Sequence, residues 1–131
     1  MNSGALKKAT LSVDFRKNRI RIHKNAIHAL DDPEYILFLV NPEERTLAIM
    51  RSDRSDLRAH RIIFASLAGM KSCELNSKSL VRGLLNIYAG WEDNTTYRID
   101  GESLPGKGVI MFNIENSVSV CETEEEGYGR K

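Results

Sequence analysis

The sequence predicts a β-rich α+β domain that contains two copies of one strand–strand–helix–hairpin unit, packed together as a pair within the chain. Apolar residues alternate with polar ones at Leu11, Val13 and Phe15, which is the period of a half-buried strand. A strand, a short helix and a hairpin then follow one another between residues 16 and 50, and the same order of elements returns after residue 60. A chain of 131 residues with 41% apolar residues is long enough to bury one core, so we expect residues 1–131 to form a single domain.

The first unit covers about residues 11–51 and begins with a strand–turn–strand. We expect Asn18 in the turn to take a left-handed backbone conformation, which asparagine tolerates better than most residues. Residues 19–22 form the next strand, with Ile20 and Ile22 facing the core and the two arginines between and before them facing out.

A helix over residues 24–30 and a hairpin complete the first unit. The helix ends at Asp31-Asp32-Pro33, because a residue before proline is disfavoured in the helical conformation. The hairpin pairs residues 35–40 with residues 46–51 around Asn41-Pro42-Glu43-Glu44, where proline presets φ and asparagine bonds to its own backbone. Residues 35–40 are apolar on both faces, so we expect them to be the most buried segment, covered by the fold or by a partner.

The second unit covers about residues 61–120. It is predicted to begin with strands at residues 61–64 and 71–75 around a turn at 65–70. A helix follows the N-cap Ser77, and one of its sides buries Leu80, Leu84, Ile87 and Tyr88. The unit ends with hairpin strands at 95–100 and 107–114 around a turn at 101–106, and Val118 and Val120 extend the last strand. A helix over residues 56–68 is the alternative for the start of this unit. The segment between the units, about residues 52–60, is predicted to be a linker, and residues 121–131 an acidic tail.

Charge is distributed unevenly along the chain. Residues 1–70 carry a net charge of +4 and residues 71–131 a net charge of −3. Residues 7–24 contain seven basic residues and one acid, Asp14. Such a cluster attracts polyanions, although basic side chains on a strand edge also serve to discourage strand pairing.

The residues of the first unit also resemble a known family. Arg19-Ile20-Arg21-Ile22, followed by a short helix and a hairpin, resembles the AbrB-like swapped-hairpin family, and two modules in one chain resemble MraZ-type proteins. In that family a strand with a glycine-arginine-aliphatic-x-aliphatic-proline pattern leads into a short helix, and two modules interleave their hairpins into a small barrel. The resemblance covers residues 11–50 better than residues 71–114. It implies an intrachain swapped-hairpin-like barrel.

The resemblance also implies DNA contacts by basic residues near the marked strand. This chain has Asn18 where the family has glycine and His23 where it has proline, and its second copy, residues 71–75, lacks the arginine. The implied contacts therefore belong to the first unit alone, and the candidate nucleic-acid-binding residues are Arg16, Lys17, Arg19, Arg21 and Lys24.

Other chemistry finds little support in the sequence. His23 and His28 lie five residues apart and do not converge as an i,i+4 ligand pair would, so we predict no metal site and no cofactor. No serine lies in a nucleophile elbow, and Cys73 and Cys121 are read as thiols without a catalytic role, so no enzyme is predicted. Tyr88 and Trp91 are expected to pack on the core, the alternative being that they stack on a base.

Two functions follow as hypotheses. The first is a DNA-binding regulatory protein of the cytoplasm, without membrane contact, which binds duplex DNA through the basic strand–turn as a monomer or small homo-oligomer. The second is a non-catalytic protein-binding module with an acidic protein partner, such as a small inhibitor or accessory protein of a phage or mobile element. The near-neutral total charge of +1 and the doubly apolar strand at residues 35–40 favour the second.

Overall fold

The computed structural model of the chain describes residues 8–62, 72–104 and 106–120, which form a nearly closed antiparallel barrel. All nine described strands belong to one sheet, with the order β5-β3-β4-β8-β7-β1-β2-β6 and with β9 beside β7. Its strands are β1 (Lys8–Asp14), β2 (Arg19–His23), β3 (Tyr35–Asn41), β4 (Thr46–Ser52), β5 (His60–Arg61), β6 (Ser72–Asn76), β7 (Thr96–Leu104), β8 (Val109–Asn113) and β9 (Val118–Val120). The helices of the described residues are α1 (Lys24–Ala29), α3 (Lys78–Leu85) and the 3-10 turn η1 (Ile114–Asn116).

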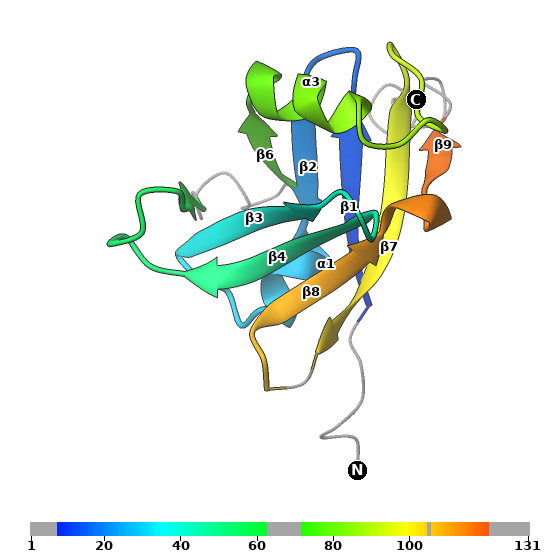
Figure 1. Cartoon of the computed structure of the whole chain (residues 1–131). Coiled ribbons are helices and arrows are strands. Elements are labelled where there is room, and N and C mark those ends of the chain that lie inside the picture. The colour runs from blue at the N-terminus through cyan, green and yellow to red at the C-terminus, as the bar shows by residue number, and fades with distance from the viewer. Residues whose placement is uncertain (1–7, 63–71, 105, 121–131) are drawn as a thin grey trace, which may run out of the picture.

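Two groups of strands lie on opposite sides of the core. In Figure 1, β3, β4 and β8 cross in front of β1, β2 and β7, and α3 lies over the upper end. The long strand β7 connects the two groups, because residues 96–102 on one edge pair with the whole of β1 and the other edge is shared by β8 and β9. Each group therefore has an inward face toward the core and an outward face toward solvent.

The core is filled by the inward side chains of both groups and by one face of each helix. Leu11, Ile22 and Ile99 on one side meet Ile49 and Phe112 on the other, and each of these side chains is fully buried. The helices close the assembly with apolar residues at helical spacing, since a face of this kind is stable only when it is covered. These residues are Ala26, Ile27 and Leu30 from and just after α1, and Val81 and Leu84 from α3.

Several local predictions are confirmed. Asn18 has a φ of 53°, and the Asn41 side chain accepts a hydrogen bond from the Glu44 backbone N–H at 3.2 Å within the first hairpin turn. Ser77 caps α3 by accepting from the Leu80 N–H at 3.3 Å. Residue types with a strong local preference for caps and turns thus determine these positions.

Two predictions about the hairpins are wrong. The predicted most buried segment, residues 35–40, contains Leu39 with 36% of its surface exposed, whereas in β1 only Lys8 is exposed. The second hairpin does not turn at residues 101–106, because β7 continues through Gly101 to Leu104 and the chain reverses at Gly106 and Gly108, whose φ angles are 74° and 66°. A Cβ on Gly101 would lie 2.4 Å from the Met111 carbonyl oxygen, so the glycine allows β7 and β8 to approach closely.

At the start of the second unit the structure agrees with the predicted strand at Arg61 and contradicts the alternative of a helix over residues 56–68 where the chain is described. Residues 56–62 form turns and the short strand β5, so a helix does not begin at residue 56. The predicted turn at residues 65–70, the acidic tail at 121–131 and Cys121 lie outside the described residues. The helix α3 ends at Leu85, so Ile87 and Tyr88 follow it rather than belong to it, although both still pack against the core.

Candidate nucleic-acid interface

Four of the five predicted basic residues lie together on the turn between β1 and β2 and on the outward face of β2. Arg16 and Lys17 are in the turn, and Arg19 and Arg21 alternate along β2 with the fully buried Ile20 and Ile22. Lys24 is the first residue of α1 and is half-buried at the far end of β2. Strand periodicity therefore brings four of the candidates to one surface and leaves Lys24 beyond it.

A buried carboxylate, Asp14, organises the turn. Its Oδ1 atom accepts hydrogen bonds from the backbone N–H groups of Arg16 at 2.9 Å and Lys17 at 3.0 Å, and Oδ2 accepts from Arg19 Nε at 3.2 Å. Burial alone would raise the pKa of Asp14, but these N–H donors and the Arg19 guanidinium outweigh it, so the pKa lies below the usual 3.8. Asp14 is thus a charged structural anchor, and it fixes where the basic residues of the turn project.

A second carboxylate, Glu74 on β6, lies opposite Arg21 in the sheet register. Glu74 Oε2 is 3.0 Å from Arg19 Nη1 and 3.7 Å from Arg21 Nε. Arg19 is consequently held between Asp14 and Glu74 with only 14% of its side chain exposed. The sequence treats the five basic residues as equivalent, whereas the structure gives Arg19 a largely structural role.

The structure adds a basic residue that sequence reasoning missed, Arg98 on β7. Ser12 on β1 pairs with Arg98 on one side and with Arg21 on the other, so the two arginines flank the same serine in one cross-strand row. Neighbouring strands are about 4.8 Å apart, which separates the backbones of Arg98 and Arg21 by about 10 Å. Arg98 is exposed and forms no ion pair with any described residue. We call the outward surface formed by Arg16, Lys17, Arg19, Arg21 and Arg98 the basic face.

The turn of the basic face is held by segments from the second half of the chain. The Phe15 N–H donates to the Thr95 carbonyl at 3.0 Å, and Arg82 donates to the Phe15 carbonyl at 3.3 Å while it pairs with Asp93 at 2.6 Å. Beneath the turn, Trp91 packs with its ring 5.4 Å from that of Phe15 and is 4% exposed. The expectation that Trp91 packs on the core is confirmed.

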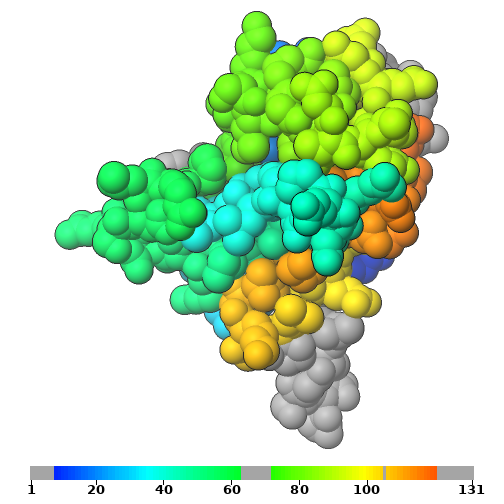
Figure 2. All heavy atoms as spheres, in the orientation of Figure 1, coloured from blue at the N-terminus to red at the C-terminus, as the bar shows by residue number. Residues whose placement is uncertain are grey.

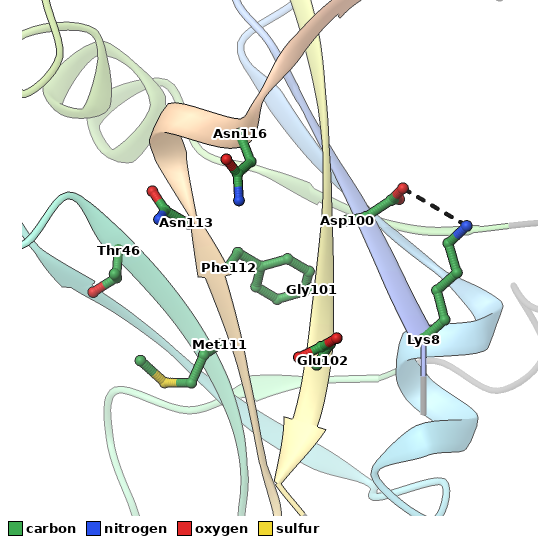
Figure 3. Close-up of a pocket in the computed structure, with 9 residues that line it drawn as sticks. All are labelled: Lys8, Thr46, Asp100, Gly101, Glu102, Met111, Phe112, Asn113 and Asn116. Carbon is green, nitrogen blue, oxygen red and sulfur yellow. Dashed lines mark ion pairs between the residues drawn. The ribbon is translucent and has the colours of Figure 1, made fainter. Parts of the chain in front are cut away.

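A groove lies on the outer side of β7 and β8, toward the end of β7 away from this turn (Figure 3). Its volume is about 510 Å³, and its charged residues are Lys8, Asp100 and Glu102, together with polar groups from β8 and its flanks. Asp100 is engaged, since it accepts from Thr10 Oγ1 at 2.9 Å and lies 3.8 Å from Lys8 Nζ. With two carboxylates and one ammonium group, the groove repels phosphate and marks the acidic end of the outward surface.

The outward side of β3, β4 and β8, which faces the viewer in Figure 2, is different in character. In register across these strands lie Leu39, Ala48 and Met111, and Leu37, Met50 and Val109 form the next row. Leu39 is 36% and Met111 40% exposed, and Leu104 at the end of β7 is also 40% exposed. We call this outward surface of Leu37, Leu39, Ala48, Met50, Leu104, Val109 and Met111 the apolar face.

Groups that could hold a metal ion do not converge in the part of the chain that is described. No three His, Cys, Asp or Glu side chains among these residues gather as metal ligands. Cys73 is buried and forms no disulfide with a described residue, and His23 lies 3.3 Å from the hydroxyl of Ser12, which is only 1% exposed. Among the described residues no helix has the length and apolar character needed to cross a membrane.

Comparison of the chain with protein-family models, with curated proteins and with solved structures returns no match. The geometry of the basic face is therefore the basis for the function proposed next.

Proposed function

We propose that the chain is a nucleic-acid-binding regulatory protein that contacts duplex DNA through the basic face. The observation that carries this proposal is the row in which Arg98 and Arg21 flank Ser12. Arginines in such a row present guanidinium donors at a spacing fixed by the sheet, and guanidinium is well matched to phosphate oxygens. Lys17, which is exposed, and Arg16, with 22% of its side chain exposed, extend the same surface at the turn.

We further propose that the barrel consists of two strand–strand–helix–hairpin repeats that exchange hairpins within the chain. The pairings support this interpretation because they are reciprocal: β7 of the second hairpin pairs with β1, and β3 of the first hairpin pairs with β5. The strands that would be equivalent in the two repeats also pair with each other, β2 with β6 and β4 with β8. Because both hairpins find their partners inside one chain, we expect a monomer in sedimentation at micromolar concentration, and an obligate dimer would count against the exchange.

The hairpin exchange matters for function because it assembles the basic face from both halves of the chain. Arg21 belongs to the first half and Arg98 to the hairpin of the second, and β1 lies between them. A fragment that ends after β4 would therefore lack one of the two flanking arginines.

The duplex is preferred over unpaired nucleic acid as the partner. Single-stranded nucleic acids are held largely by stacking of bases on exposed aromatic rings. The aromatic residues nearest to the basic face, Phe15, Trp91 and Tyr97, are at most 7% exposed and pack on one another. Contacts to phosphates then remain as the main source of affinity, and such contacts position a protein without reading bases.

The test is a titration of labelled duplex DNA at several salt concentrations. Each lost phosphate contact reduces the log–log salt slope by about 0.9, so we expect that reduction for Arg98→Ala and about twice it for the Arg16→Ala/Lys17→Ala double variant. Lys107→Ala, which removes an exposed lysine of the β7–β8 turn far from the basic face, is the matched control and leaves the slope unchanged. Equal slopes for all these proteins would contradict phosphate contact by the basic face.

A second candidate function is a protein-binding module whose acidic partner occupies the same face. The observation in its favour is that Asp14 and Glu74 already bind Arg19, so carboxylates fit this surface. Titration with poly-glutamate separates the two functions. Binding of poly-glutamate that Arg98→Ala weakens, together with no binding of duplex DNA or RNA at low salt, would favour the acidic protein partner.

A further inference from the structure

We infer that Glu74 limits the basic face to one side of the β2–β6 pair, so that a duplex is contacted through β7, β1 and β2 but not through β6. This inference rests on the proposed function of the basic face and identifies which part of that face meets phosphate. It starts from the cross-strand row Arg98, Ser12, Arg21 and Glu74, which runs from β7 to β6 in one register.

The sign of the charge changes at one position within this row. On β7, β1 and β2 the row contains two arginines and a serine, and on β6 it ends in a carboxylate. If the two repeats are equivalent, β2 and β6 are equivalent strands that pair antiparallel, and Arg21 and Glu74 face each other at the centre of that pair. A symmetric assembly would present arginine on both sides of this centre, whereas this chain presents arginine on one side and glutamate on the other.

Glu74 acts in two ways. Its carboxylate repels phosphate directly. It also pairs with the two arginines on β2, at 3.0 Å from Arg19 Nη1 and 3.7 Å from Arg21 Nε, and so competes with phosphate for their donor groups. Arg21 is 21% exposed in this arrangement, while Glu74 itself is 34% exposed and within reach of a ligand at the surface. Nothing comparable restrains Arg98, which has no ion pair with the described residues.

The consequence is a contact surface without two-fold symmetry. Arg98 and the turn residues carry the phosphate contacts, and Arg21 contributes in part. The bound duplex therefore needs no inverted repeat, because only one side of the β2–β6 centre can face a phosphate backbone.

The experiment compares Glu74→Gln with Glu102→Gln in the full-length protein. Both substitutions keep the side-chain size and remove one negative charge from the same outward surface, but Glu102 has no ion pair with a described residue. Releasing Arg21 to one phosphate should tighten duplex binding by about three- to tenfold at moderate salt and raise the salt slope by about 0.9 for Glu74→Gln. Glu102→Gln should change affinity by less than about twofold, since an exposed charge at a distance is screened.

A double variant tests whether the tighter duplex binding of Glu74→Gln depends on Arg21. In the Arg21→Ala background, Glu74→Gln should produce little further tightening, because the arginine that it releases is absent. Equal responses of the two glutamine variants, or weaker binding by Glu74→Gln, would overturn the inference while the basic face keeps its function. Absence of duplex binding by all of these proteins at low salt would overturn the proposed function and the inference together.

Discussion

The basic face and the apolar face are both outward surfaces of one sheet, yet they are stabilised differently. On the basic side, polar residues beneath the arginines are buried: Ser12 is 1% exposed, Asp14 2% and Thr96 4%. On the apolar side, Leu39 and Met111 remain 36% and 40% exposed. Buried polar groups must be hydrogen-bonded and are costly to disrupt, whereas half-exposed apolar groups gain only part of their transfer energy. The polar surface should therefore be the less tolerant of the two to substitution.

The largest effect is expected at Asp14. Replacement by alanine removes a carboxylate that accepts from two backbone N–H groups and from Arg19. Leaving these donors unpaired should lower the free energy of unfolding by about 2–4 kcal/mol, measured by urea denaturation. Glu102→Ala is the control on the same outward surface, and as an exposed residue without an ion pair to any described residue it should change stability by at most about 0.5 kcal/mol. Similar losses for the two variants would contradict the lower tolerance expected of the buried polar groups.

The same carboxylate should make the protein sensitive to acid. The pKa of Asp14 is lower in the folded protein than its usual value of 3.8, so the unfolded chain binds a proton more readily. The stabilisation is fully present above about pH 4 and is lost as the pH falls through the lowered pKa of the folded state. We expect Asp14→Asn to flatten the dependence of stability on pH below about 4. Parallel curves for the wild type and Asp14→Asn would contradict this role.

The local structure of the basic side could be predicted from the sequence, but the pairing of its strands could not. Local signals predicted the left-handed conformation at Asn18, the cap at Ser77 and the alternation of Ile20 and Ile22, because each depends on a single residue or on strand periodicity. The position of Arg98 beside Ser12 depends on the pairing of β1 with β7, and these two residues are more than eighty positions apart in the chain. No local pattern encodes such a pairing.

The apolar side illustrates a different limit of sequence reasoning. Residues 35–40 are apolar at every position, and this pattern predicted burial on both faces. The structure buries Ile36 on the core side of β3 and also Leu37 on the outward side, which is 9% exposed, and it leaves Leu39 on that outward side 36% exposed. The contacts of Glu74 with Arg19 and Arg21 could not be predicted from the sequence either. They join β2 and β6, which a helix and a hairpin separate along the chain.

A moderate effect is expected from truncating the apolar face. Leu39→Ala should lower the free energy of unfolding by about 1 kcal/mol, because the side chain is already partly in water. Leu47 lies on β4 of the same hairpin but is fully buried in the core, so Leu47→Ala should cost about 2–5 kcal/mol and serves as the matched comparison. A loss at Leu39 as large as that at Leu47 would mean that the outward side of β3 is covered in solution.

The smallest effect on stability is expected at Arg98. Comparing Arg98 with Arg19 tests which residues of the basic face bind and which are structural. Arg98→Ala removes an exposed side chain without an ion pair to described residues and should change the free energy of unfolding by at most about 0.5 kcal/mol. Arg19→Ala, on the same face, breaks contacts with both Asp14 and Glu74 and should cost about 1–2 kcal/mol.

Duplex binding should rank these two arginines in the opposite order. Arg98 is exposed and has no ion pair with a described residue, whereas the Arg19 side chain is 14% exposed and pairs with two carboxylates. Arg98→Ala should therefore reduce the salt slope by about 0.9 and Arg19→Ala by clearly less. The comparison requires conditions in which both variants are folded, which the denaturation curves establish. If Arg19→Ala weakens binding more than Arg98→Ala while both remain folded, the ion pairs of Arg19 do not prevent phosphate contact. The division of the basic face into a structural and a binding part would then be wrong.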